Sequence, residues 1–198
     1  ICAGCAVAAD LRLGIIGTDT SHVIVFTQIL NNETSPDHVP GGRVVAAYKG
    51  GSPDVESSAT RVDKFAEELR TKWKVQFYSS IPEMCRKVDA VLLESVDGRV
   101  PREQARQVFA AHKPVFIDKP VAGSLADAVE LYRLAAETGT PCWSSSSLRF
   151  SPGILGMRSD ERLGKVLGCE ARGPGGPARL VGEALAARGV AVVVGERA

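Results

Sequence analysis

The chain has 198 residues, of which 44% are hydrophobic and 24% charged, values typical of a globular protein with one or two domains. Its 24 Lys and Arg residues nearly balance 23 Asp and Glu residues, so the charge predicts neither nucleic acid nor an anionic membrane as a partner. No apolar run is long enough to span a bilayer.

The first ten residues differ in composition from the rest of the chain. Residues 1–10 are mostly small and apolar, and Ala6-Val7-Ala8 matches the pattern found before a signal-peptidase cut. We interpret them as the remnant of an export signal, which predicts a periplasmic or otherwise exported protein. The alternative is an unstructured terminus of a cytoplasmic protein.

The five cysteines are scattered along the chain. Cys2 and Cys5 have the spacing of a redox pair, but no strand precedes them, which favours a structural interpretation. No cluster of His, Asp or Glu has metal-ligand spacing around the cysteines, so the sequence predicts no metal site.

The first strand and helix form the start of a nucleotide-binding pattern. An apolar strand over residues 11–17 ends at Gly17, and an apolar-rich helix follows over residues 22–30. A strand, a glycine and a helix N-terminus together bind pyrophosphate, because exposed N–H groups and the positive end of the helix dipole face the anion. We therefore expect a cofactor site lined by Gly17, Thr18, Asp19, Thr20, Ser21 and His22.

Two of these residues depart from the glycine fingerprint. The pattern G-x-G-x-x-G, started at Gly17, requires glycine where the chain has Asp19 and His22. A carboxylate at position 19 puts a side chain where backbone approaches phosphate, and its charge repels that group. The competing interpretation is that Asp19, Thr20 and Ser21 only cap the helix.

The second strand, over residues 43–48, ends at a lysine. NAD-binding proteins place an acid at this point to bind the ribose hydroxyls, and here Lys49 stands instead. A cation suits the 2′-phosphate, so NADP is favoured over NAD as the cofactor. A solvated lysine is the alternative.

Helices and strands alternate through the middle of the chain. A helix is predicted by the spacing of Val62, Phe65, Ala66, Leu69 and Trp73. Strands are predicted over residues 75–78, 89–95, 115–117 and 140–146. Two later helices are expected to face the core, one through Ala105, Val108, Phe109 and His112, the other through Leu125, Ala128, Val129, Tyr132 and Ala136. This alternation predicts the α/β fold class with a doubly wound parallel sheet.

The strand over residues 115–117 ends abruptly in Asp118, Lys119 and Pro120. In open α/β sheets the chemistry lies just beyond the carboxyl ends of the strands. Pro120 keeps Lys119 out of helical geometry, so the ammonium should project from a rigid strand end into the crevice. We expect Lys119 and Asp118 to be catalytic. The alternative is a strand followed by a solvated lysine.

Four stretches resemble the Gfo/Idh/MocA oxidoreductases, which include glucose–fructose oxidoreductase and inositol dehydrogenase. They are Gly14-Ile15-Ile16-Gly17, the strand over residues 90–94, Asp118-Lys119-Pro120 and Leu148-Arg149-Phe150-Ser151-Pro152. The resemblance covers residues 11–170. The family has Glu-Lys-Pro where this chain has Asp118-Lys119-Pro120, a conservative change.

The resemblance implies an NAD(P)-binding Rossmann domain followed by an α/β domain with an open sheet, and a sugar, polyol or derivative as substrate. The family's lysine corresponds to Lys119, which contacts the substrate hydroxyl and nicotinamide, and Pro120 belongs to the same motif. Ser95 and Asp97 follow the fourth strand, where the family lines the nicotinamide pocket. The family often has Asn there and a His shortly after, and residues 96–101 depart from that pattern.

The chain therefore divides into four predicted parts. Residues 1–10 are the signal remnant, 11–147 the Rossmann domain, and 148–172 a polar connection and the start of a second domain, with a strand near 165–170. Residues 173–198 could form a helix over 178–188 and a strand over 190–194. Because 20 of these last 26 residues are Gly, Ala, Val or Arg, we instead expect an out-of-frame translation or a truncated domain.

Catalysis is expected to be incomplete in this chain. The family's second domain supplies a His for proton transfer, and no His follows residue 163. Homo-oligomers, which the family forms through that domain's sheet, are expected only if the domain were complete. The alternative function is a non-catalytic Rossmann module that lost dinucleotide binding through Asp19.

Overall fold

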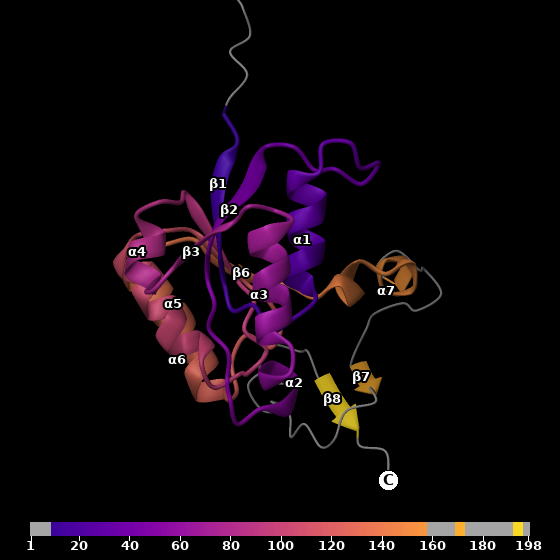
Figure 1. Cartoon of the computed structure of the whole chain (residues 1–198). Helices are drawn as coiled ribbons and strands as arrows, with labels where there is room; N and C mark the ends of the chain where they lie inside the picture. Colours follow the sequence, from indigo (N-terminus) through magenta and orange to yellow (C-terminus); the bar gives the residue numbers. More distant parts are fainter. Residues whose placement is uncertain (1–8, 158–168, 173–191, 196–198) are drawn as a thin grey trace, which may run out of the picture. The chain divides into compact units, whose positions relative to one another are not determined.

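Six parallel strands form the large sheet of the chain (Figure 1). They are β1 (Leu11–Ile16), β2 (Gly42–Tyr48), β3 (Gln76–Tyr78), β4 (Ala90–Leu93), β5 (Val115–Ile117) and β6 (Cys142–Ser144). Their order across the sheet is β3-β2-β1-β4-β5-β6, and each neighbouring pair is parallel. The predicted doubly wound parallel sheet is confirmed. Because the order reverses between β1 and β4, a crevice opens beyond the carboxyl ends of these two strands.

This computed structural model describes residues 9–157, 169–172 and 192–195. The chain divides into two units, at Ser146 and Ser147. The interpretation of residues 1–10 as a signal remnant falls almost entirely outside the described residues, as does most of the 173–198 tail. Among the described residues, no helix combines the length and apolar character needed to cross a bilayer.

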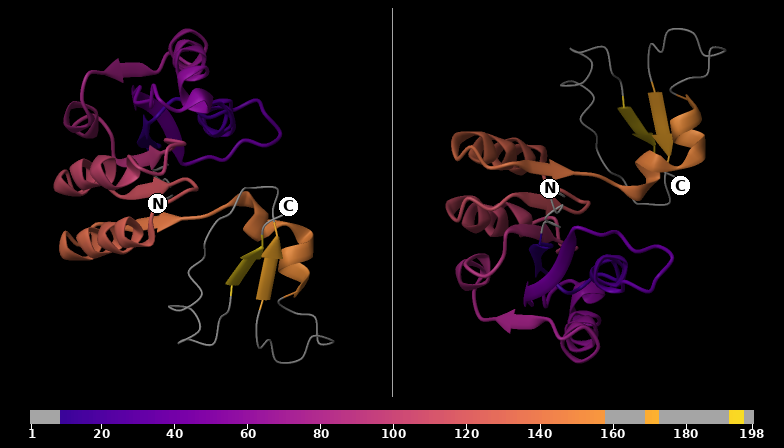
Figure 2. Two further views of the ribbon diagram at one scale, coloured as in Figure 1. Left: turned by 90° about the horizontal axis from the view of Figure 1, so that it is seen from below. Right: turned by 90° about the horizontal axis from the view of Figure 1, so that it is seen from above.

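Helices cover both faces of the sheet. They are α1 (His22–Asn31), α2 (Glu56–Ala59), α3 (Val62–Thr71), α4 (Ile81–Cys85), α5 (Pro101–Ala110) and α6 (Leu125–Glu137). Neighbouring strand residues point to opposite faces, so Ile15 joins the core under α1 and α3, whereas Ile16 joins the core under α4, α5 and α6. The helices α5 and α6 lie side by side (Figure 2).

The predicted inward face of α3 is confirmed, because Val62, Ala66 and Leu69 are buried. The prediction for α6 is wrong. Leu125 and Val129 are 50% and 60% exposed, whereas Leu131 and Ala135 are buried. Because α6 carries apolar residues on more than one face, helical spacing alone did not decide which face would pack against α5 and the sheet.

The face predicted for α5 is correct except at its end. Ala105, Val108 and Phe109 are buried as expected. His112 lies beyond the helix, is exposed, and has a φ of 51°. The chain enters the left-handed conformation there, which often follows a helix C-terminus and turns the imidazole away from the core.

The second unit begins with two helical segments, where the sequence predicted an irregular connection. These are the 3-10 helix η1 (Ser147–Phe150) and the short helix α7 (Pro152–Met157). Pro152 suits the first position of a helix because its missing N–H would have no partner there. Further along, β7 (Cys169–Arg172) pairs in parallel with β8 (Val192–Gly195). The helix considered for residues 178–188 lies outside the described part.

Candidate functional site

Three strand ends gather the chemistry of this chain at one edge of the sheet. β4 lies between β1 and β5 and is parallel to both. The turn that begins at Gly17 follows β1, Glu94 follows β4, and Asp118 and Lys119 follow β5. The sheet therefore carries Lys119 at the same edge as the Gly17 turn, with one strand between them.

Gly17 has a φ of +85° and lies tightly against the residue after Glu94. A Cβ atom at this position would lie 2.4 Å from Ser95 Oγ and 2.7 Å from Ser95 N. The Gly17 N–H donates to Tyr48 O at 3.0 Å, and the Thr18 N–H donates to Lys49 O at 2.9 Å. Only glycine fits both the conformation and the space, so the turn is held between the ends of β2 and β4.

Asp19 points into the protein. Its side chain is fully buried, and its carboxylate accepts hydrogen bonds from Ser58 Oγ at 2.6 Å and from Val96 N at 3.4 Å. Thr18 is also buried, with its hydroxyl beside the carbonyl oxygens of Lys49 and Val62. The carboxylate at position 19, where the fingerprint requires glycine, therefore joins the first turn to α2, which carries Ser58, and to the segment after β4, which carries Val96.

Thr20 and Ser21 complete the turn before α1. The Thr20 hydroxyl accepts a hydrogen bond from the His22 N–H at 3.3 Å, whereas Ser21 is exposed and its side chain makes no capping bond. The first turn of any helix leaves N–H groups without intrahelical partners. The N-terminus of α1 therefore offers donors and a positive dipole end to an anion in the crevice.

Asp97 is a second buried acid, and its carboxylate is bonded to a hydroxyl and to a cation. Its carboxylate accepts from Ser52 Oγ at 2.6 Å and from the Arg99 guanidinium at 2.7 Å. Arg99 also pairs with Asp54 at 2.8 Å. The Arg99 hydrogen bonds, helped by Ser52, hold the pKa of Asp97 well below its ordinary value.

A pocket of about 400 Å³ adjoins the Gly17 turn. It is lined by Tyr48, Gly50, Gly51, Ile81, Arg99, Val100, Glu103, Gln104 and Gln107. A Cβ atom on Gly50 would lie 3.2 Å from Gly17 Cα, so the pocket and the turn are in contact. Ser95 Oγ donates to Gln104 Oε1 at 2.9 Å, which fixes one wall.

Lys49 lies at the end of β2 and is about half exposed. Its ammonium pairs with Asp63, which is 82% exposed at its side chain. Such surface pairs contribute about 0–1 kcal/mol, so the pair exchanges readily for another anion.

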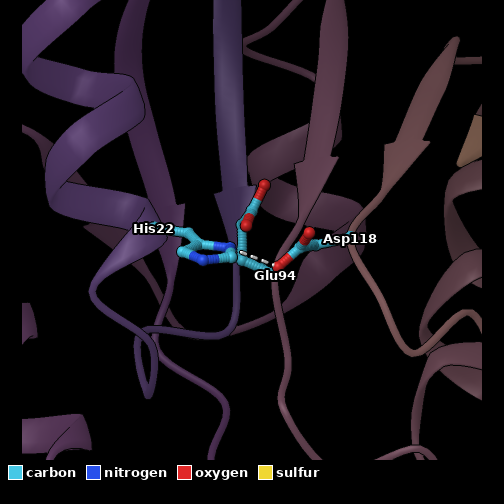
Figure 3. Close-up of side chains that lie close together, drawn as sticks. All are labelled: His22, Glu94 and Asp118. Carbon is cyan, nitrogen blue, oxygen red and sulfur yellow. Dashed lines mark hydrogen bonds and ion pairs between the residues drawn. The ribbon is translucent and has the colours of Figure 1, made fainter. Parts of the chain in front are cut away.

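His22, Glu94 and Asp118 form a compact group beside the turn (Figure 3). His22 Nδ1 lies 2.6 Å from Asp118 Oδ2. Glu94 is 1% exposed, and neither of its carboxylate oxygens has a hydrogen-bond partner among the residues that the structure describes. Burial, and to a smaller extent the negative charge of Asp118, raise the pKa of Glu94 to about 8. The positive charge of Lys119 opposes this rise.

Lys119 itself is exposed, and its peptide bond to Pro120 is cis. Its positive charge reaches Glu94 strongly enough to oppose the rise in that residue's pKa. In the described part of the chain, none of the ion pairs within 4.0 Å includes the Lys119 ammonium. The ammonium is thus available to a bound molecule.

The sequence predicted a cofactor-binding turn at residues 17–22 and catalytic residues after β5. The structure brings these two groups together, since His22 contacts Asp118. Ser95 and Asp97, expected beside nicotinamide, form hydrogen bonds with Gln104 and Ser52 near the pocket. Sequence reasoning missed Glu94. The available signal was an acid that ends a strand predicted to be buried on both faces.

Comparison with known proteins identifies the fold and the family that it matches. Residues 11–146 match the Gfo/Idh/MocA model, described as an oxidoreductase family with an NAD-binding Rossmann fold. No match was found among the curated proteins.

Solved structures give the same fold. Apo scyllo-inositol dehydrogenase from Lactobacillus casei aligns with a TM-score of 0.62 at 16% identity, over 82% of this chain and 45% of that one. Myo-inositol 2-dehydrogenase from Lactobacillus plantarum aligns at 0.60 and 17%, over 83% and 45%. An oxidoreductase from Agrobacterium radiobacter in complex with NAD+, L-tartaric acid and magnesium aligns at 0.60 and 16%, over 79% and 41%. This chain therefore spans less than half the length of these structures.

Proposed function

The chain belongs to the Gfo/Idh/MocA family of oxidoreductases with an NAD-binding Rossmann fold, and from this we propose that it acts as the cofactor-binding part of an NAD(P)-dependent oxidoreductase whose substrate is a sugar, a polyol or a derivative of one. The observation that carries the proposal is the Gly17 turn, which joins the N-terminus of α1 to a pocket of about 400 Å³ at the strand-order reversal.

The residues present fit a dinucleotide. The N-terminus of α1 suits the pyrophosphate, and the pocket beside Gly50 suits the adenosine half. Asp19, which the sequence placed against the phosphates, has its carboxylate bonded to Ser58 and Val96 inside the protein. This arrangement supports binding, because the charge is matched by donors that belong to the chain itself.

Lys119 is the residue we assign to the chemistry. Its exposed ammonium follows β5 at the crevice edge, where a substrate hydroxyl can approach it. A bound nicotinamide would supply the hydride acceptor for the reaction. The ammonium would stabilise the alkoxide that forms when the substrate hydroxyl gives up its proton, which in the family passes to a His of the second domain; loss of hydride from the carbon then converts the alkoxide to a carbonyl.

We infer a preference for NADP over NAD. Lys49 stands at the end of β2, where its pairing with the exposed Asp63 is easily exchanged. Arg99 lines the adjoining pocket and supplies a second cation, although it already binds Asp97 and Asp54. Both cations favour a 2′-phosphate in this region.

Fluorescence titration of the purified chain with NADPH and NADH tests this proposal. We expect saturable binding of both, with NADPH tighter, and a loss of about tenfold in NADPH affinity in Lys49→Ala, since one phosphate contact is removed. Lys64→Ala, an exposed lysine on α3, is the matched control. Absence of saturable binding of either cofactor would favour a non-catalytic Rossmann module instead.

The substrate class is tested separately with a panel of sugars and polyols. Because the chain is expected to lack the family's proton-transfer His, binding is measured instead of turnover. A member of the panel should bind the chain loaded with NADP+, and this binding should be lost in Lys119→Ala and retained in Lys113→Ala. Lys113 precedes β5 at the opposite edge of the sheet and serves as the control.

A further inference from the structure

The group formed by His22, Glu94 and Asp118 has a property that dinucleotide binding does not explain. Glu94 is 1% exposed, yet in the described part of the chain no donor forms a hydrogen bond with either carboxylate oxygen. A buried carboxylate without a partner is strongly unfavourable, so native proteins pair such groups with donors, cations or metals. The Lys119 ammonium is close but forms no ion pair with Glu94 within the described residues.

The three side chains present one donor atom each, and these atoms all lie within 4.8 Å of one another. They come from the start of α1, the end of β4 and the end of β5, and Figure 3 shows them gathered at one point of the sheet edge. Strand ends and a helix start are rigid supports, so the group is held in place by the fold itself.

From this geometry we propose that His22, Glu94 and Asp118 bind one divalent transition-metal ion, of which Zn²⁺ is the type. Two carboxylates and a neutral imidazole carry two negative charges, which a divalent ion neutralises. The metal would also supply the missing partner of Glu94. His22 and Asp118 also belong to the predicted cofactor and catalytic residues, but zinc binding can be measured without cofactor or substrate, so its failure is distinguishable from failure of the proposed function.

The donor set selects the class of metal. Imidazole nitrogen favours zinc and its neighbours in the first transition row over magnesium or calcium, which prefer oxygen ligands alone. Three protein ligands with an open position are typical of zinc sites that also hold water or a substrate atom. The site lies beside Lys119, so the open position would face the same crevice.

The distances require only a small adjustment. A tetrahedral zinc site with bonds of about 2.0–2.1 Å has donor atoms about 3.3 Å apart, so the widest separation must close by at most about 1.5 Å. His22 Nδ1 and Asp118 Oδ2 are 2.6 Å apart, so they would move apart by about 0.7 Å and exchange their hydrogen bond for bonds to the metal. Rotation of the unpartnered Glu94 side chain supplies the remaining movement, because it has no hydrogen bond to break.

Titration of chelator-stripped protein with ZnCl2 by calorimetry tests the site. Cys2 and Cys5 have a spacing that can bind zinc, so Cys2→Ser/Cys5→Ser serves as the parent protein. We expect one zinc per chain, and an affinity lower by about 100-fold or more in Glu94→Gln and in Asp118→Asn. His38→Gln and Glu68→Gln, which change a histidine and an acid outside the group, should bind as the parent does.

X-ray absorption at the zinc edge keeps the test decisive if a variant fails to fold. The parent should show one imidazole nitrogen with oxygen donors and no sulfur. Fewer than one zinc per chain, a sulfur shell, or equal affinity in a folded Glu94→Gln would each overturn the proposal.

Discussion

The buried acids near the carboxyl ends of the strands differ in whether their carboxylates have hydrogen-bond donors. Asp19 and Asp97 accept hydrogen bonds from Ser58 and Ser52, and Asp97 also binds Arg99. Glu94 is also buried, but its carboxylate has no hydrogen-bond partner within residues 9–157, 169–172 and 192–195. The hydrogen bonds of the first two acids join separate segments of the chain. Glu94 weakens the fold in its ionised form, and proteins retain such a residue where function requires it.

Gly17 joins the two regions, so the largest expected effect comes from changing it. Gly17→Ala should lower the free energy of unfolding by about 3–5 kcal/mol, because its Cβ would overlap Ser95 and its backbone would be strained. Gly139→Ala is the matched control, since its φ is also positive at 62° but no described atom lies within 4 Å of the added Cβ. We expect about 1 kcal/mol there. Urea denaturation measures both, and equal losses would contradict the role of the Ser95 contact.

The next largest effect is expected in the pH dependence of the free energy of unfolding, measured on chelator-treated protein, to which Glu94 contributes. The folded-state pKa of about 8 lies above the ordinary value of 4.5, so the folded state binds the extra proton between these values. Stability contributed by Glu94 is fully present below pH 4.5 and is lost as the pH rises through 8. Glu94→Gln should remove this loss, on the order of 3 kcal/mol between about pH 5 and 8.

Urea denaturation of the parent and of Glu94→Gln at several pH values provides the measurement. The variant should equal or exceed the parent in stability above about pH 7, because an amide carries no charge to bury. Parallel pH profiles for the two proteins would show that Glu94 titrates normally and is not isolated from solvent.

The smallest expected effect on the free energy of unfolding is at Asp19, whose carboxylate has hydrogen-bond donors, and it should be opposite in sign to the effect at Glu94. Asp19→Asn keeps the shape of the side chain but weakens its bonds to Ser58 and Val96, so unfolding should require about 1–3 kcal/mol less free energy at pH 7. Glu68→Gln on the surface should change it by less than about 0.5 kcal/mol. The comparison predicts opposite signs for Asp19→Asn and Glu94→Gln, and a shared sign would remove the distinction between the two regions.

Much of the fold was predictable because its signals are local. The alternation of apolar strands with helices predicted the parallel sheet, and the strand before Asp118 and Lys119 was placed correctly. The inward face of α6 was not, because α6 has one apolar face with Leu125 and Val129 and another with the buried Leu131 and Ala135. The helical segments η1 and α7 were also missed, since the glycine and polar residues in this stretch are more typical of an irregular connection.

By itself the sequence determined the layered α/β architecture, the glycine turn after β1 and the charged end of β5, because each depends on neighbouring residues. Only the tertiary structure decided what the buried acids contact. Asp19 meets Ser58 across 39 residues and Val96 across 77, and His22 meets Asp118 across 96. Such contacts arise where parallel strands end together, and no local pattern encodes which side chains will meet there.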